Sequence, residues 1–289
     1  MIRKLKWGVI FVLFSISIYA NDVIVTLSSQ DINLGEPIKV QVVTTKPIKE
    51  YKLSLLNKKF TLFLENKSKK KYKYTAMIGI NRRKKSGSYK LKVDIRLKNK
   101  IKFYENYKIN LTYIENRKKG KVNLSKRKTK LSNNKRAYKN EYELISNKFK
   151  KLSNKKYFNS RFKMPAKGRV SSIFGKMRYY NNGNISSHAG LDIANKKGTA
   201  ILAPQKGVVI FSDKLDVHGN TVMIDHGQGV ISIFCHLNKR SIKHKKRVKK
   251  GQKIGEMGMT GVASGVHLHW GMSVQNIRVD PVFFLKHKY

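Results

Sequence analysis

Cysteine is almost absent from this chain of 289 residues, which contains only Cys235. A single thiol excludes an intrachain disulfide, a cysteine-based zinc finger and an iron–sulfur cluster. Proline is also rare, with five residues, and glycine does not recur at every third position, which excludes collagen-like and proline-rich chains. Hydrophobic residues make up 40% of the chain, enough to build packed cores, and the length fits two domains better than one.

Acidic residues are scarce as well. The chain has 16 Asp and Glu against 63 Lys and Arg, which gives a formal net charge of +47. So strong a charge predicts an anionic partner, and nucleic acid is the first class to consider. The absence of base-stacking motifs and the pattern of the N-terminus both argue against nucleic acid.

The first 20 residues have the pattern of a secretory signal peptide. Three basic residues lie within the first six positions, an apolar run follows over residues 9–19, and Ala20 offers a small residue at the cleavage site. The run is too short to span a bilayer, which takes about 20 residues. The alternative, a buried strand of a cytosolic protein, leaves the basic start unexplained. We therefore expect an exported protein of the periplasm or cell envelope, where anionic wall polymers and membrane headgroups are available partners.

Residues 21–115 alternate in the manner of β-structure. Runs rich in β-branched residues occupy 22–27, 39–43, 89–97 and 101–114, with turn residues between them. In 89–97 the apolar residues fall at every second position and the charged ones between them, as in a strand with one buried face. Several short strands at this spacing predict an immunoglobulin-like β-sandwich. The region has no histidine, and we find no catalytic set in it.

Residues 116–160 combine 16 Lys and Arg with two acidic residues and few apolar ones, which predicts a solvated basic linker. One apolar stripe interrupts this composition, because Tyr142, Ile145, Phe149 and Leu152 recur at three- and four-residue steps. The stripe indicates a short helix that docks on a neighbouring domain. A disordered tether is the alternative, because short helices are only marginally stable by themselves.

Residues 161–289 contain 15 of the 20 glycines and all eight histidines. Strand-like runs occupy residues 207–211, 221–225, 230–236 and 266–270, with glycine-containing turns between them. This pattern predicts a compact antiparallel β domain. The chain as a whole is therefore predicted to be mainly β.

The clearest chemical signal is the pair His267 and His269. Residues two apart on a strand point to one side, so both imidazoles share a face, although in isolation they could equally be surface residues. His188 and Asp192 also share a face if their stretch is extended, and Gly190 leaves the space between them open. Imidazole nitrogen and carboxylate oxygen are ordinary zinc ligands. His188, Asp192 and His269 together would leave the fourth tetrahedral position to water, which is the catalytic arrangement.

A third signal is His236, which directly follows Cys235 in a strand-like run. Adjacent strand residues point to opposite faces, so Cys235 is predicted to be a small buried hydrophobe and His236 to face the cleft. A catalytic Cys–His pair is the alternative, and the same alternation disfavours it.

The order of these motifs resembles the lysostaphin/LytM-type zinc endopeptidases of bacterial cell walls. The resemblance covers about residues 168–285. It is carried by blocks at residues 172–175, 188–194, 219–220, 224–227, 235–237, 251–255, 258–261, 264–270 and 279–281. A second likeness, at residues 34–42, 74–80 and 86–91, is to a domain that accompanies some of these peptidases.

The resemblance implies that residues 161–289 form a LytM-type peptidase domain that binds zinc through His188, Asp192 and His269. It also implies that His236 and His267 assist catalysis. All five residues are present, which disfavours the degenerate, non-enzymatic branch of the family.

Two positions depart from the family's usual pattern. Phe234-Cys235 stands where Tyr-Ala commonly precedes the assisting histidine, and Val266 stands where Pro commonly precedes the second motif. The Phe removes a hydroxyl that would be available to a substrate. These changes bear on rate and specificity more than on the metal.

The predicted function is that of an exported zinc metallo-endopeptidase that cuts peptide bonds in peptidoglycan stem or cross-link peptides. The alternative on the same fold is a non-enzymatic wall-binding or amidase-activating protein. Charge alone favours a nucleic-acid-binding protein, but we expect no nucleic acid partner. The basic run at residues 239–253, with nine Lys and Arg, is interpreted as a solvated loop or as a contact for anionic wall polymers or membrane headgroups.

Overall fold

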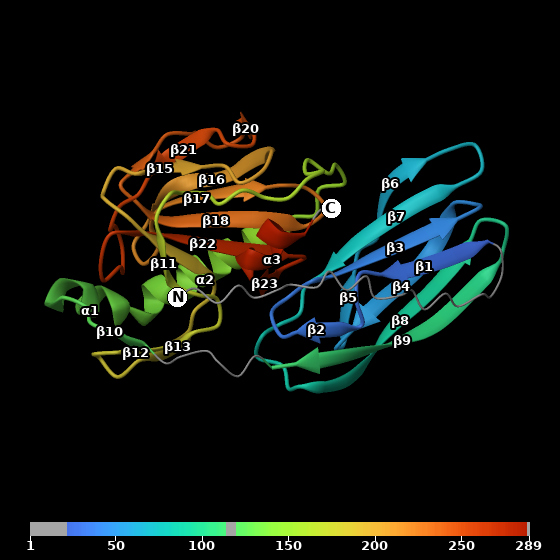
Figure 1. The fold of residues 1–289 in the computed structure, drawn as a ribbon, viewed down its shortest axis with the longest axis horizontal. Coiled ribbons are helices and arrows are strands. Elements are labelled where there is room, and N and C mark those ends of the chain that lie inside the picture. The colour runs from blue at the N-terminus through green and yellow to red at the C-terminus, as the bar shows by residue number, and fades with distance from the viewer. Residues whose placement is uncertain (1–21, 114–119, 288–289) are drawn as a thin grey trace, which may run out of the picture.

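The computed structural model describes residues 22–113 and 120–287, and it is mainly β, as predicted (Figure 1). The predicted signal peptide, residues 1–20, lies outside the described residues. Among the helices of the described part, none combines the length and the apolar character that a membrane crossing requires.

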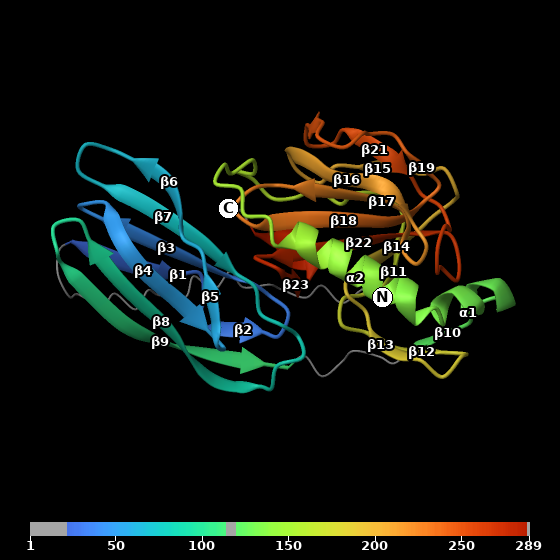
Figure 2. The same ribbon diagram turned by 180° about the vertical axis from the view of Figure 1, so that it is seen from behind.

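The N-terminal region consists of two sheets (Figures 1 and 2). The first sheet is antiparallel, with the strand order β1 (Val23–Leu27), β3 (Ile38–Thr44), β7 (Tyr72–Ile78) and β6 (Phe63–Lys67). The second has the order β2 (Asp31–Asn33), β9 (Lys102–Thr112), β8 (Gly87–Leu97), β4 (Ile48–Leu55) and β5 (Lys58–Phe60). Within it only the β2–β9 pair is parallel.

Strand β8 shows why this region folds as sheets. Leu91, Val93, Ile95 and Leu97 are fully buried, and the charged residues between them point outward, so the period-two pattern of the sequence is confirmed. The buried side chains of both sheets belong to one hydrophobic cluster. The immunoglobulin-like assignment of this region stays a prediction.

The segment after the second sheet contains β10 (Gly120–Val122), α1 (Lys126–Ser132) and α2 (Lys135–Phe149). The side chain of Asn134 caps α2 by accepting a hydrogen bond from the amide of Ala137. The helix buries one residue per turn, namely Ala137, Glu141, Ile145 and Phe149.

The buried face of α2 differs from the predicted stripe. Ile145 and Phe149 are buried, but Tyr142 is 73% exposed and Leu152, beyond the helix, is 43% exposed. Residues four apart lie on one face of a helix, so the face set by Ile145 and Phe149 includes Glu141 and leaves its neighbour Tyr142 to the side. The stripe predicted from the sequence did not include Glu141, because it was defined by apolar residues alone.

The C-terminal part is built on one eight-stranded sheet. Its strand order is β11 (Arg169–Ser172), β14 (Leu191–Ala194), β22 (His267–Val274), β18 (Val230–Leu237), β17 (Gly219–Asp225), β16 (Gly207–Leu215) and β20 (Arg247–Val248), with β23 (Ile277–Val279) paired to β22. All of its pairs are antiparallel. The four strands predicted in this region are present as β16, β17, β18 and β22.

Two small sheets and one helix complete the C-terminal part. One sheet joins β10 to β12 (Met177–Tyr180) and β13 (Ile185–Ser187), and the other joins β15 (Ala200–Leu202), β21 (Lys253–Glu256) and β19 (Lys239–Arg240). The helix is α3 (Pro281–Lys286). The basic run 239–253 is largely exposed, but it is not only a loop, because β19, β20 and the start of β21 lie within it and pair with neighbouring strands.

Strand β18 separates two packed layers. Ile231, Ile233 and Cys235 point into a cluster with Ile145 and Phe149 of α2. Phe234, on the other side of the strand, belongs to the main core. Helix α2 therefore covers one face of the sheet, as Figure 2 shows, and the predicted alternation along this strand is confirmed.

The N-terminal sheets contact the C-terminal part directly. The side chain of Gln275 accepts a hydrogen bond from the amide of Thr61 (2.8 Å) and donates to the carbonyls of Thr61 (3.0 Å) and Met77 (3.1 Å). Arg82 donates to the hydroxyl and the carbonyl of Ser187, both at 2.8 Å. These bonds link residues more than 100 positions apart in the chain.

Truncation of Ile95 tests the packing of the N-terminal sheets. Ile95 is fully buried in β8, so Ile95→Ala should lower the free energy of unfolding by about 2–5 kcal/mol through lost burial and the cavity left behind. Asp94→Ala removes the exposed neighbour and should change it by less than about 0.5 kcal/mol. Denaturant unfolding of the full chain measures both. Equal effects of the two substitutions would contradict the observed packing of β8.

Candidate metal centre

Three candidate ligands meet where β14 pairs with β22. The antiparallel register places Asp192 opposite His269, although the two are 77 residues apart in sequence. His188 lies just before β14, and His267 lies two positions before His269 on the same strand. The structure therefore brings together the three predicted ligands, His188, Asp192 and His269.

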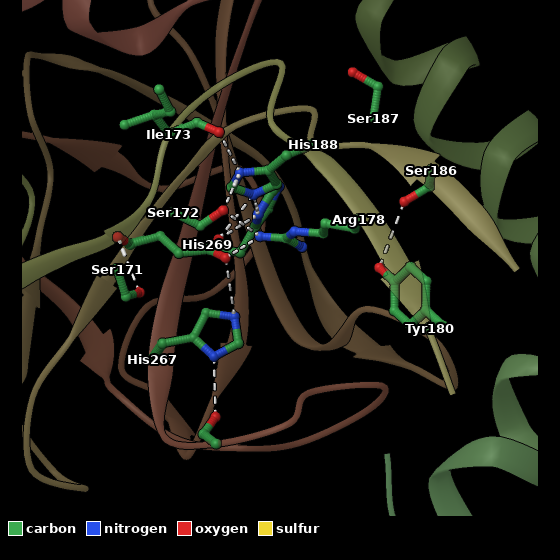
Figure 3. Close-up of polar contacts among 12 residues, drawn as sticks. Ser171, Ser172, Ile173, Arg178, Tyr180, Ser186, Ser187, His188, His267 and His269 are labelled. Carbon is green, nitrogen blue, oxygen red and sulfur yellow. Dashed lines mark hydrogen bonds and ion pairs between the residues drawn. The ribbon is translucent and has the colours of Figure 1, made fainter. Parts of the chain in front are cut away.

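The donor atoms of these three residues lie close together. Asp192 Oδ1 is 2.9 Å from both His188 Nε2 and His269 Nδ1, and these two nitrogens are 2.9 Å from each other. His188 and Asp192 are buried, and His269 is half-buried. Figure 3 shows the imidazoles of His188 and His269 close together.

The donor set fits a metal ion. His188 Nδ1 lies 2.8 Å from the carbonyl oxygen of Ile173, which can only accept, so Nδ1 carries the hydrogen. The neutral ring then presents the lone pair of Nε2 to Asp192 Oδ1, itself an acceptor. A metal ion between these two atoms would satisfy both lone pairs. Two imidazole nitrogens and one carboxylate oxygen are a normal zinc set.

Burial favours the protonation states that bind a metal. It lowers the pKa of His188 below its ordinary value and the pKa of His269 to about 3, so both rings are neutral at physiological pH. Burial alone would raise the pKa of Asp192. The contacts of its carboxylate with His188 and His269 outweigh burial and hold that pKa well below its usual range.

Gly190 leaves room for the ring of His269 beside Asp192. An added Cβ there would lie 2.5 Å from the carbonyl oxygen of Trp270 and 2.8 Å from the ring of His269. Any side chain at this position would push His269 away from Asp192, so the predicted role of Gly190 in keeping the space open agrees with its surroundings.

Arg178 also reaches the carboxylate, and the sequence did not point to it. Its Nη2 donates to Asp192 Oδ2 and, at 3.1 Å, to the hydroxyl of Ser172 (Figure 3). This pairing turns Oδ1 toward the two imidazoles. No local signal could have found Arg178 among 63 basic residues, because its position depends on the pairing of β12 with β13.

The two predicted assisting histidines lie beside the ligands. The ring centroids of His236 and His267 are 5.0 Å apart, and those of His236 and His269 are 6.2 Å apart. His236 Nδ1 is 2.8 Å from the carbonyl of Thr260, and His267 Nδ1 is 2.9 Å from that of Gly265. Carbonyls only accept, so both Nδ1 atoms carry hydrogen, and Nε2 is the nitrogen of each ring that remains for other partners.

Charge and burial set the state of His236. Burial, with the neighbouring His267 and His269 adding to it, lowers the pKa of His236 well below its ordinary value. The ring is therefore neutral and can accept a proton at Nε2. His267 Nε2 is 3.8 Å from Asp192 Oδ2, so it faces the same carboxylate as the ligands do.

An open cavity of about 340 Å³ gives access to these residues. One wall comes from β10 and β12, and the other from residues 262–267. Asp192, His236 and His267 line it, together with the four cationic residues Lys121, Arg169, Lys176 and Arg178. The cavity therefore suits an extended, anionic ligand.

The remaining candidates have structural surroundings. Cys235 is fully buried, and burial raises the pKa of its thiol to about 12, which disfavours a thiolate nucleophile. His226 is buried between the carbonyl of Lys206 (2.7 Å) and the hydroxyl of Ser232 (2.7 Å). The prediction that Cys235 is a small buried hydrophobe agrees with its position, and His226 also lies outside the cluster of His188, Asp192 and His269.

The comparisons with known proteins bear on this part of the chain. Residues 186–281 match Peptidase family M23. The chain carries a peptidase M23 domain. The match includes all of the predicted site residues, namely His188, Asp192, His236, His267 and His269.

Similar proteins include both hydrolases and an activator. The "Peptidoglycan DD-endopeptidase ShyC" of Vibrio cholerae is 40% identical over 114 residues, 39% of this chain and 26% of that protein. The "Murein hydrolase activator NlpD" of Escherichia coli is 32% identical over 127 residues, 44% of this chain and 31% of that protein. The similarity thus spans only about a quarter to a third of the length of these relatives.

One solved structure is similar over most of the chain. A putative peptidase M23 from Pseudomonas aeruginosa superposes with a TM-score of 0.60 and 26% sequence identity. The similarity covers 85% of this chain and 92% of that one, so it extends beyond the M23 domain into the N-terminal sheets.

Thiol labelling tests the buried position of Cys235. A thiol reagent should modify the native chain slowly, because the sulfur has no access to solvent and its raised pKa keeps the thiol protonated at neutral pH. In denaturant the same thiol should react at the rate of a free cysteine, and Cys235→Ala should not react. Fast labelling of the native chain would contradict the observed burial.

Proposed function

We propose that this protein is an exported zinc metallo-endopeptidase that hydrolyses peptide bonds in peptidoglycan stem or cross-link peptides. The observation that carries the proposal is the convergence of three candidate metal-ligand atoms beside a cleft that also holds two further imidazoles. The peptidase M23 match and the peptidoglycan endopeptidases among the relatives support the substrate class.

Zinc would be held by His188, Asp192 and His269, and when bound it supplies a Lewis acid that polarises the scissile carbonyl and makes water acidic enough to attack at neutral pH. Arg178 orients the Asp192 carboxylate and shares its charge. The carbonyl of Ile173 fixes the ring of His188.

His236 and His267 supply acid–base catalysis in this proposal. Each ring has its Nδ1 hydrogen committed to a carbonyl, so Nε2 is the atom that accepts a proton from the attacking water and returns one to the leaving amine. A protonated imidazole beside the scissile bond also stabilises the oxyanion. The fixed rings need little rearrangement during the reaction.

The charge of the cleft suits peptides with free carboxylates. Lys121, Arg169 and Lys176 line the cavity, which has Asp192 as its only carboxylate among the described residues. Stem peptides of the wall carry carboxylates along their length, so attraction would raise their local concentration at the site. The large net charge of the chain supports an anionic partner, and the signal-peptide pattern of residues 1–20 supports an exported location.

The second candidate function is that of a non-enzymatic wall-binding or hydrolase-activating protein, which the similarity to NlpD favours. The complete set of three ligand atoms and two further imidazoles argues for catalysis. Bound zinc together with hydrolysis of purified peptidoglycan, its fragments identified by mass spectrometry, supports the enzyme. Absence of both from the folded protein supports the activator.

Removal of two ligands tests the metal site. The full chain should bind one zinc per molecule, and the double variant His188→Ala, Asp192→Ala should lose most of it, since only one of three donors remains. Metal analysis after dialysis measures the stoichiometry. His244→Ala removes an exposed histidine and should leave it unchanged. Zinc retained in full by the double variant would refute this ligand set.

Substitution of the assisting histidines separates catalysis from metal binding. His236→Ala and His267→Ala should keep bound zinc but lower hydrolysis by about 10²–10⁴-fold, the usual contribution of a general acid or base. Metal content and peptidoglycan hydrolysis are measured on the same preparations. Full activity in either variant would remove that histidine from the mechanism.

A further inference from the structure

Helix α2 carries a buried carboxylate whose hydrogen bonds all go to one turn. Glu141 is 6% exposed and points at the turn between β16 and β17. Its Oε1 accepts from the amide of Val217 (2.7 Å), and its Oε2 accepts from the amide of His218 (3.1 Å) and lies 2.6 Å from His218 Nδ1. The Glu141 carboxylate thus hydrogen-bonds to the backbone amides of Val217 and His218 and to the ring of His218.

This carboxylate is ionised despite its burial. Burial alone would raise the pKa of Glu141, but its bonds with the His218 ring and the Val217 amide outweigh burial and lower that pKa below the ordinary value. Hydrogen bonds to a charged acceptor are the stronger kind. Loss of the carboxylate would leave the amides of Val217 and His218 in a partly buried turn without their acceptor, which loosens the turn.

The turn is bonded directly to the backbone of His236. The amide of His236 donates to the carbonyl of His218 at 2.9 Å. His236 has a φ of 65° and lies at a bulge, where the register between β17 and β18 shifts. Such a conformation is uncommon for a residue with a Cβ and persists only where its surroundings hold it.

The same turn also supports the ring of His236 through Thr260. Thr260 Oγ1 accepts from the amide of Asn220 (2.9 Å), and the Thr260 carbonyl accepts from His236 Nδ1 (2.8 Å). Gly219 lies so close that an added Cβ would be 2.3 Å from Thr260 Oγ1. A shift of the turn at residues 217–220 therefore moves both the backbone bond and the ring bond of His236.

We propose that Glu141 is a positioning residue for His236, through which helix α2 supports the catalytic site from outside the cleft. The inference rests on the proposed function, because positioning of His236 affects catalysis only if His236 acts in it. Glu141 itself does not reach the cleft, since it acts through the turn.

Docking of the helix and positioning of the turn depend on different residues of α2. Ile145 and Phe149 pack into the apolar cluster under the sheet, whereas Glu141 bonds only to the turn. Loss of stability and loss of positioning can therefore be separated by substitution.

The test compares four variants of the full chain. Glu141→Ala should lower kcat by about 10–100-fold, as when a residue that orients a catalytic group is lost, with a much smaller change in KM and no loss of zinc. Glu141→Gln keeps one carbonyl acceptor for the turn and should fall between Glu141→Ala and the wild type. Glu143→Ala removes an exposed glutamate of the same helix and should leave kcat unchanged.

The fourth variant controls for stability. Ile145→Ala weakens docking of α2 but keeps the carboxylate, so it should lower Tm at least as much as Glu141→Ala while keeping most of kcat. A wild-type kcat in Glu141→Ala, or an equal loss of kcat in Ile145→Ala, would overturn the positioning role. Glu141→Gln supplies the comparison if Glu141→Ala does not fold.

A measurement without substrate separates this inference from the proposed function. The amide of His236 should exchange its hydrogen at least about 10-fold faster in Glu141→Ala than in the wild type or Glu143→Ala, as followed by NMR, because its acceptor moves with the turn. Unchanged exchange would overturn the inference. Faster exchange in a protein that hydrolyses no peptidoglycan would leave the coupling in place and refute the proposed enzyme.

Discussion

The antiparallel pairing of β14 with β22 is the constraint on which the site depends. It sets Asp192 opposite His269 and, through the two-residue period of the strand, brings His267 to the same side. A slip of one residue would turn both histidines into the core and expose Leu268, which is fully buried. The apolar core therefore fixes the register, and the register fixes the donor set.

Period-two reasoning explains which parts of the site could be predicted. It placed the His267 and His269 side chains on one face and turned Cys235 into the core, because these properties follow from the strand alone. Arg178 and Glu141 could not be found in this way, since both reach their partners through tertiary packing. The left-handed conformation of His236 was also hidden, because local sequence does not show where a bulge will fall. The apolar stripe did indicate that α2 docks, but it did not show that the buried face of the helix includes Glu141.

The net charge of +47 constrains the structure as much as it indicates a partner. The chain has few carboxylates, and two of the buried ones have specific contacts: Asp192 belongs to the proposed ligand set, and Glu141 bonds to a turn. Each is matched by donors that keep it ionised. Most of the remaining Lys and Arg side chains lie in solvent or along the cleft. Their mutual repulsion there favours binding of an anionic ligand.

The proposed metal ligands and the proposed acid–base groups are held in different ways in this domain. His269 and Asp192 lie within paired strands, whose ladders leave them little freedom. His236 lies where the ladder is interrupted, so its position depends on the neighbouring turn and on the loop that carries Thr260. A group that must exchange protons can tolerate such a setting only if the supporting segments are themselves fixed. In the proposed mechanism, helix α2 provides that support from outside residues 186–281. A segment of linker-like composition is in this way coupled to the cleft.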